Sequence, residues 1–548
     1  MTSLYQLLFS KQAKSLVSFS ILSLITGVIN IILFAYLGQL INQITSNGYQ
    51  QLKYDALFFL LIIVFFVLTR RFLAVSFVNF TQTTISRLKT ELITNILRST
   101  HSIVSSKREV IQNTLTRDIT QITIAGNLLA ELISSIMVVL GCTIYLAFLS
   151  WKFLVVLLLL ISVAAISYLI NVNYLKRSYE KVKILSDEFI KYLHQIVFGF
   201  KEISVNKDKG KDLLMNHVKP NLMRYANLYV NFSMRNITSQ NIGVVVIYSI
   251  LGLLIFYGTD ALSISKGSLI TFLFTFYFVI GPINSILGLL PVVVEANISA
   301  KKLIELNQTL TENTETSDDF FIQETKSPPV DPNIPFESFA VREIRYRYNN
   351  SDTNFEIGPI TFDIKAGEVM FIYGENGSGK TSLFLCMLGV LKCDQGEIKL
   401  NGSLVSKNYT DMVSVVFSDF FLFDRFYGTT NYDFSKADYY LKLFELDKKV
   451  SITKDGFSTT KLSMGQRKRL ALINCLLEDK SIIMLDEWAA DQDPEFRRKF
   501  YTEIIPTLKE KGKTVIAISH DDKYYSVADK LYKMEAGKLI RINRHESY

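Results

Sequence analysis

The chain has 548 residues, of which 49% are hydrophobic and only 20% are charged. This length exceeds that of one ordinary domain, and the mean hydropathy of +0.24 exceeds that of an ordinary soluble protein. The net charge of +8 is modest, which argues for basic loops beside apolar helices rather than for nucleic-acid binding. The composition therefore predicts a multidomain membrane protein.

Residues 1–305 contain six stretches of the roughly 20 mostly apolar residues that a membrane-spanning helix needs. They are 16–43, 55–80, 128–150, 152–172, 240–259 and 268–294. Long segments separate the second span from the third and the fourth from the fifth. The segment 173–239 alone carries twelve Lys and Arg residues. Because basic loops stay in the cytosol, we expect both long segments and both chain ends to be cytosolic.

The long segments are rich in Lys, Glu, Leu and Ile, which predicts helices that continue past the bilayer. Each is expected to turn at its far end, near 102–108 and near 205–211. These turns either form a docking surface for a soluble domain or are simply solvated hairpins.

Arg70 and Arg71 follow an apolar run, and charges inside a membrane are costly. They either line a polar pathway, which would favour an anionic or polar cargo, or extend toward the cytosolic headgroups. Other polar residues of the spans either face a wet interior or pack between helices. These are Asn30, Gln39, Asn42, Gln43, Tyr277 and Asn284.

A polar, proline-containing linker is predicted at 306–336, and a soluble domain at 337–548. This domain opens with an alternating strand that ends at Tyr348, whose ring either stacks on adenine or packs on the surface. Downstream, an apolar strand at 369–373 leads into a glycine loop and then a helix-forming run. The loop reads Gly374, Glu375, Asn376, Gly377, Ser378, Gly379, Lys380, Thr381.

Strand, glycine loop and helix in this order predict a nucleotide phosphate site. The glycines let backbone N–H groups point at phosphate oxygens, and the helix adds its positive N-terminal end. Lys380 is expected to reach the β- and γ-phosphates, and the Thr381 hydroxyl to bind Mg²⁺.

The apolar run 481–485 ends in Asp486 and Glu487. It predicts a buried parallel strand whose carboxylates lie at the edge where open α/β sheets bind ligands. Asp486 is expected to hold Mg²⁺ and Glu487 to take a proton from the attacking water. A second buried strand, 514–518, leads to His520, which is either a γ-phosphate ligand or a structural histidine.

The run Leu462, Ser463, Met464, Gly465, Gln466 completes a set of motifs that, in chain order, resembles the ABC ATPases. Gly374–Thr381 resembles the Walker A loop, Leu462–Gln466 the signature, Asp486-Glu487 the Walker B end, Asp493 the D-loop and His520 the H-loop. With six spans ahead of them, these motifs resemble an ABC half-exporter: an all-α transmembrane domain followed by an α/β P-loop ATPase domain.

The resemblance implies a homodimer with two ATP molecules, each held between Lys380 of one chain and Ser463 and Gly465 of the other. It also implies that Tyr348 stacks on adenine, that Gln466 and Asp493 belong to the nucleotide site, and that the stalk turns transmit closure. Two positions depart from the family pattern, because Met464 and Ser418 replace the usual glycine and the Q-loop glutamine. Since serine is shorter, Ser418 would reach Mg²⁺ through water, or Asp419 would substitute.

Trp488 within the stretch 485–494, and Asp521-Asp522 after His520, resemble the exporters of cyclic peptides and siderophore precursors. A serine at the Q-loop position fits that group. The resemblance implies ATP-driven, Mg²⁺-dependent export of a cyclic, lasso or non-ribosomal peptide-like compound across the bacterial cytoplasmic membrane. The alternatives are a lipid or multidrug exporter on the same scaffold, and a membrane-bound ATP switch that does not transport.

Overall fold

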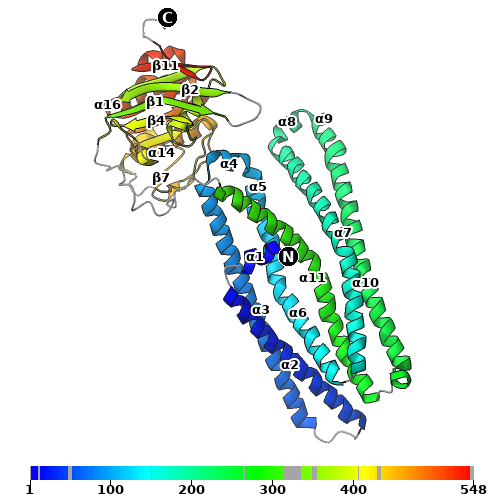
Figure 1. The fold of residues 1–548 in the computed structure, drawn as a ribbon. Coiled ribbons are helices and arrows are strands. Elements are labelled where there is room, and N and C mark those ends of the chain that lie inside the picture. Colours follow the sequence, from blue (N-terminus) through cyan, green and yellow to red (C-terminus); the bar gives the residue numbers. More distant parts are fainter. Residues whose placement is uncertain are drawn as a thin grey trace. The chain divides into compact units, whose positions relative to one another are not determined.

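The computed structural model describes residues 2–9, 13–46, 52–149, 151–262, 266–312, 335–348, 355–404, 407–428 and 434–542. The chain divides into two compact units (Figure 1). The first is Met1–Ser99 with Val104–Thr314, and the second is Thr100–Ile103 with Glu315–Tyr548.

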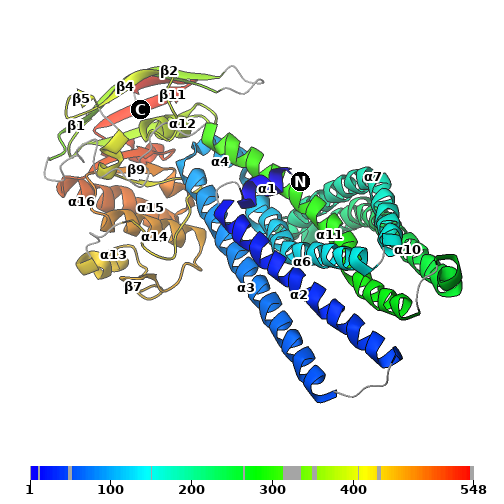
Figure 2. The same cartoon turned by 60° about the horizontal axis from the view of Figure 1, so that its bottom comes forward.

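The first unit is all helical, as the sequence predicts. Its long helices are α2 (Ala13–Ser46), α3 (Leu52–Arg98), α6 (Ile119–Leu149), α7 (Trp151–Phe198), α10 (Lys219–Leu262) and α11 (Lys266–Glu312). A short helix, α1 (Thr2–Phe9), precedes them and packs on α11. In Figure 2, α7 and α10 lie side by side as one pair, while α6 packs against α2 and α11.

Each predicted span falls within one long helix, apart from residue 150, which lies outside the described residues. Within the described part of the chain, four stretches are long and apolar enough to cross a membrane. They are Ile21–Leu40, Tyr54–Arg98, Arg108–Phe148 and Leu269–Glu312. The spans 152–172 and 240–259 lie in α7 and α10, where the structure does not describe many of the side chains. The bounds of these two spans in the membrane therefore stay predictions.

The predicted turns of the long segments are confirmed. Short helices α4 (His101–Ser106) and α5 (Arg108–Asn113) follow α3, and a π-helical turn η1 (Thr114–Asp118) leads into α6. At the far end of the α7–α10 pair lie α8 (Phe200–Val205), α9 (Lys207–Asp212) and a second π-helical turn, η2 (Leu213–Val218) (Figure 1). The Asn206 side chain caps α9 by accepting hydrogen bonds from the backbone N–H groups of Asp208 and Lys209.

The predicted start of the linker at residue 306 is wrong. The helix α11 continues to Glu312, because Leu306 and Leu310 on its inner face are buried at 3% and 0% exposure. The Asn95 side chain also donates a 2.7 Å hydrogen bond to the Asn307 side chain. The remainder of the predicted linker, up to residue 334, lies outside the described residues.

The second unit has a six-stranded sheet in the order β12-β11-β3-β10-β9-β6. Its strands are β3 (Val369–Gly374), β6 (Val413–Val416), β9 (Ile482–Asp486), β10 (Thr514–Ile518), β11 (Lys530–Glu535) and β12 (Lys538–Ile542). Strands β11, β3, β10, β9 and β6 are parallel, and β12 pairs antiparallel with β11. Ile518 pairs with Ile372 on one side and with Asp486 on the other, so the carboxyl ends of β3, β10 and β9 meet at one edge.

A second, antiparallel sheet has the order β2-β1-β4-β5. Its strands are β1 (Ser338–Arg347), β2 (Glu356–Lys365), β4 (Gln395–Leu400) and β5 (Ser403–Leu404). A hydrophobic core joins this sheet to β3 and to the helix α12 (Lys380–Met387), which follows the glycine loop. A small antiparallel hairpin, β7 (Ile452–Thr453) and β8 (Gly456–Phe457), lies between β6 and β9 in the chain.

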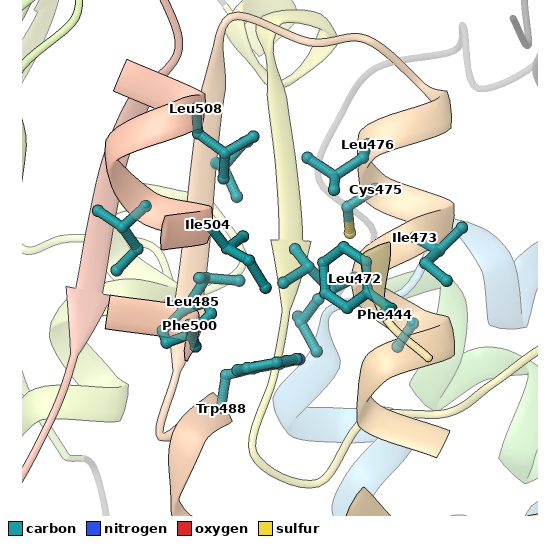
Figure 3. Close-up of a cluster of buried hydrophobic side chains, with 14 of the residues drawn as sticks. Phe444, Leu472, Ile473, Cys475, Leu476, Leu485, Trp488, Phe500, Ile504 and Leu508 are labelled. Atoms are coloured by element: carbon teal, nitrogen blue, oxygen red, sulfur yellow. The ribbon is translucent and has the colours of Figure 1, made fainter. Parts of the chain in front are cut away.

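A second core lies between the six-stranded sheet and the helices α13 (Ala437–Leu443), α14 (Met464–Leu477), α15 (Pro494–Lys499) and α16 (Ile505–Glu510), with the π-helical turn η6 (Phe500–Ile504). In Figure 3, side chains of α14 face Phe500, Ile504 and Leu508, with Trp488 at one end of the cluster. Trp488 is 1% exposed, and its ring centroid lies 4.4 Å from that of Phe500. This core fixes α14 against the end of β9, where the predicted site residues lie.

Candidate functional site

The glycine loop lies between β3 and α12, as predicted. Gly377 and Gly379 have φ angles of 80° and 103°, which residues with a Cβ rarely adopt, so the loop curls tightly. The Lys380 ammonium folds back over this curl and donates 2.9 Å hydrogen bonds to the carbonyls of Gly374 and Glu375. Burial lowers the pKa of Lys380, while the carboxylates of Glu487 and Asp486 oppose that shift.

Asp486 ends β9 and is fully buried. Its Oδ2 accepts hydrogen bonds from the hydroxyls of Thr381, at 3.2 Å, and Ser418, at 3.1 Å. Among the described residues none donates a hydrogen bond to its Oδ1. Burial raises the pKa of Asp486, and the hydroxyl of Ser418 counteracts that shift. A buried carboxylate with an unpartnered oxygen, beside two hydroxyls, is a set of oxygen donors that suits Mg²⁺.

Glu487 and His520 are brought together from the ends of neighbouring strands. His520 Nε2 lies 3.1 Å from Glu487 Oε1. Glu487 also has a φ angle of 48°, which is uncommon for a residue with a side chain. Strained backbone of this kind concentrates at functional sites. The pairing of β9 with β10 therefore explains why two residues 33 positions apart meet at this edge.

A hollow of about 320 Å³ lies above the loop. Its lining includes the predicted residues Tyr348, Asn376, Gly377, Gly379, Lys380, Thr381 and Glu487. Phe355 and Ser382, which the sequence analysis did not single out, also line it, and Ser382 shares a 2.5 Å hydrogen bond with the Tyr348 hydroxyl. The hollow therefore runs from an aromatic pair to the catalytic carboxylate predicted from the sequence.

The signature residues lie at the start of α14, where Ser463 and Met464 are exposed and Gly465 and Gln466 are half-buried. Ser463 caps this helix and exchanges hydrogen bonds with Gln466 in a capping box. Asp493 caps α15 by accepting a 2.9 Å hydrogen bond from the backbone N–H of Phe496, and this bond helps to lower its pKa. Ser463, Gly465, Gln466 and Asp493 do not line the hollow around Lys380 of the same chain.

A buried lysine beside the site was not among the residues predicted from the sequence. Lys468, on α14, is 2% exposed and donates a 2.9 Å hydrogen bond to the backbone carbonyl of Glu487. The neighbouring Arg469 binds the side chains of Gln492 and Asp493. The only signal for these contacts in the sequence is a pair of basic residues at the start of a buried helix.

In the helical unit, Arg70 and Arg71 are both exposed in the single chain. Asn30 is 5% exposed and donates a 2.9 Å hydrogen bond to the carbonyl of Thr26, which fits a packing role. Gln39, Asn284 and Tyr277 are exposed, and the side chains of Asn42 and Gln43 lie outside the description. The two alternatives for the arginines therefore stay open.

Comparisons with known proteins agree with this arrangement. The ABC transporter family profile matches residues 357–490. The chain is 30% identical over 441 residues to the ATP-binding protein SyrD of Pseudomonas syringae pv. syringae. This alignment covers 78% of this chain and 77% of SyrD. It is also 30% identical over 227 residues to CydD, the glutathione/L-cysteine transport system ATP-binding/permease protein of Bacillus subtilis, over 38% of each chain.

The fold also has a close structural relative. A bacterial Atm1-family ABC exporter with ATP bound superposes with a TM-score of 0.76 over 96% of this chain and 95% of its own, at 15% identity. At that identity the likeness concerns the fold alone. The long similarity to SyrD, the ABC profile and the shared fold together establish the family. The chain belongs to the ABC transporters and has the architecture of a half-exporter, whose ATPase unit couples ATP hydrolysis to transport across a membrane.

Proposed function

We propose that the protein exports a cyclic, lasso or non-ribosomal peptide-like compound across the bacterial cytoplasmic membrane by alternating access. Two chains would bind two ATP molecules, and closure of the ATPase units would drive the helical units. Both chain ends and the ATPase unit would lie in the cytosol. The observation that carries the ATPase part is the convergence of Lys380, Asp486, Glu487 and His520 at one sheet edge.

Each group at that edge has a role that its chemistry supports. The glycine loop and the start of α12 would hold the phosphates, with Lys380 exchanging its bonds to the loop carbonyls for phosphate oxygens. Glu487 would accept a proton from the attacking water, and His520, which contacts Glu487, would hydrogen-bond the γ-phosphate. Tyr348 and Phe355 at the other end of the hollow would pack on the adenine.

Asp486 and the hydroxyls of Thr381 and Ser418 would hold Mg²⁺. The unpartnered Oδ1 of Asp486 supports this assignment, because a buried carboxylate oxygen without a donor is costly. When bound, Mg²⁺ would neutralise charge on the β- and γ-phosphates. In the single chain the Ser418 hydroxyl donates to Asp486, and its contact with Mg²⁺ through water stays a prediction.

A homodimer would complete the site. The lining of the hollow in one chain includes neither Ser463 nor Gly465, and both lie at the N-terminal end of α14. A helix N-terminus favours phosphate, and its side-chain cap leaves other N–H groups available. The signature end of a second chain would therefore close the hollow over the γ-phosphate, with Gln466 and Asp493 beside it.

The peptide-like cargo rests on the sequence around Trp488 and on Ser418, which resemble the cyclic-peptide exporters. A lipid or multidrug exporter is the alternative, because cargo contacts vary independently of the ATPase motifs. Stimulation of ATP hydrolysis by cyclic peptides, compared with phospholipids and hydrophobic amines in the same nanodiscs, decides between them. A switch protein without transport would show no cargo movement into inverted vesicles with any of these compounds.

The ATPase assignment is tested by Glu487→Gln in the full-length protein. We expect ATP binding to persist while hydrolysis falls about a hundredfold or more, because the proton acceptor is lost. Glu495→Gln is the matched control, because this substitution removes the same charge from an exposed residue in the first turn of α15. Undiminished hydrolysis in Glu487→Gln would remove Glu487 from the role of base.

A further inference from the structure

Lys468 is an unusual residue for the interior of a protein, because lysine is almost never fully buried unless it is paired. It lies on α14, just past the capped start of the signature helix. Its ammonium donates a 2.9 Å hydrogen bond to the backbone carbonyl of Glu487 and lies 2.7 Å from Asp491 Oδ2. Its side chain is 3% exposed, whereas Asp491 is 45% exposed. The lysine thus reaches from buried surroundings to the segment that carries the proposed base.

Other contacts join the same two segments. The indole N–H of Trp488 donates a 2.8 Å hydrogen bond to the carbonyl of Lys468. The Gln492 side chain donates a 3.1 Å hydrogen bond to the carbonyl of Gly465. A Cβ added at Gly465 would lie 2.6 Å from the carbonyl oxygen of Asp491, so the two backbones are in direct contact. The start of α14 and residues 487–492 therefore form one connected unit.

The backbone at Glu487 needs such support. Its φ angle of 48° is sparsely populated for a residue with a Cβ, and conformations of this kind persist when neighbouring groups hold them. Its N–H donates a 3.1 Å hydrogen bond to the carbonyl of Ile518, and its carbonyl accepts from Lys468. Both peptide groups of Glu487 are thus fixed, one by the sheet and one by the signature helix.

We propose that Lys468 is a positioning residue that holds the Glu487 backbone and so links the signature helix to the catalytic base of its own chain. This inference rests on the proposed function, in which Ser463 and Gly465 contact the ATP of the partner chain. The same helix then contacts one ATP with its first turn and, through Lys468, sets the base for the other. Binding at one site would therefore be coupled to hydrolysis at the second through a contact inside one chain.

The test compares Lys468→Met, Lys468→Gln and Lys468→Arg in full-length protein in nanodiscs. Methionine fills a similar volume without the charge or the donor, and glutamine keeps an N–H donor on a shorter side chain. We expect Lys468→Met to lower kcat about tenfold or more while the affinity for ATP changes less than twofold. If Lys468 couples the two sites, the Hill coefficient for ATP in this variant should lie closer to 1 than that of the wild-type protein. Lys468→Arg should recover part of kcat, because it keeps a charged donor.

Leu472→Val is the matched control for lost stability. Leu472 is fully buried on the same helix and belongs to the hydrophobic core. We expect it to lower the unfolding temperature while kcat and the Hill coefficient stay at wild-type values. If Lys468→Met does not fold, Lys468→Gln provides the same comparison, and its kcat should fall at an unchanged affinity for ATP.

Two results would overturn the inference. One is a wild-type kcat and Hill coefficient in Lys468→Met or, where that variant does not fold, in Lys468→Gln. The other is a loss of kcat no larger than that of Leu472→Val at equal loss of thermal stability. Failure of the proposed function looks different, because hydrolysis would then survive Glu487→Gln. Hydrolysis that depends on Glu487 but ignores Lys468 would overturn this inference alone.

Discussion

Ser418 shows how one side chain can alter a site without rearranging it. Its hydroxyl donates to Asp486 Oδ2, the oxygen that also accepts from Thr381. A glutamine, which the ABC pattern places here, has a longer side chain and would reach beyond this carboxylate oxygen. The serine instead stays against the carboxylate, so its main effect in the single chain is to orient Asp486 and to oppose the raised pKa of that group.

We therefore predict that Ser418→Ala lowers ATP hydrolysis only about two- to tenfold, because the lost hydrogen bond orients Asp486 and does not contact the reacting groups. Lys380→Ala should abolish binding and hydrolysis together, because it removes the charge that faces the phosphates. Steady-state hydrolysis and ATP titration of both variants, side by side, check this order. A loss in Ser418→Ala as complete as that in Lys380→Ala would show that the hydroxyl contacts the reacting groups directly.

The residues of the sheet edge could be predicted from the sequence because each follows a buried strand. Asp486, Glu487 and His520 meet because parallel strands end at the same edge. Lys468 could not be found in this way. Its partner, Glu487, is 19 positions away, and their contact depends on how α14 packs beside β9, which no local pattern specifies.

The π-helical turn η1 holds two long helices of the helical unit together through a buried aspartate. Its last residue, Asp118, is 5% exposed and accepts 2.8 Å hydrogen bonds from Lys183 on α7 and Ser299 on α11. Burial lowers the pKa of Lys183, although Asp118 counteracts that shift. This buried pair therefore joins α7 to η1, and the same aspartate joins η1 to α11.

We predict that Lys183→Met and Asp118→Leu each destabilise the protein by about 3 kcal/mol, because each leaves one buried charge unpaired. The double variant should recover most of that loss, since it leaves no buried charge. Denaturant unfolding in detergent measures the cycle. Arg117→Met is the control, because its pair with Asp187 is 33% and 44% exposed and should contribute less than about 1 kcal/mol. Additive losses in the double variant would contradict a coupled pair.

Whether a segment forms a helix or a strand could largely be predicted from the sequence, but the residues at which it begins and ends were harder to predict. The strand 514–518 matches β10, because a continuous apolar run has clear ends. The end of α11 was misplaced, since Leu306 and Leu310 are separated by the polar residues Asn307, Gln308 and Thr309, which resemble the linker that follows. Only packing shows that these two leucines belong to the helical unit, where they are buried.

On the scale of the whole molecule, the proposed ATP site would be completed by a second copy of the chain. Within one ATPase unit the glycine loop lines the hollow, whereas Ser463 is exposed and does not line it. The resemblance to the ABC ATPases implies this division, because in the proposed dimer the signature of one chain would face the glycine loop of the other. The cargo was less accessible to prediction, since no motif in the helical unit specifies it.

We predict that ATP brings Ser463 of one chain against the phosphate loop of its partner. Cysteines at Asn376, which is exposed on that loop, and at Ser463 should then form a disulfide-linked dimer, because such a bond needs Cα atoms closer than about 7 Å. The Glu487→Gln background keeps ATP intact during oxidation. Non-reducing electrophoresis should show the dimer with ATP and the monomer without nucleotide.

Each single cysteine variant is the control, because neither should form this dimer. The native cysteines interfere little, since Cys142, Cys386 and Cys475 are buried and Cys393 is half-buried. ATP affinity is measured for the double cysteine variant before oxidation, so that a failure to bind is recognised. A cross-link of equal yield with and without ATP would contradict nucleotide-driven closure. A variant that binds ATP yet gives no cross-link would place the signature of the partner elsewhere, and the composite site would have to be abandoned.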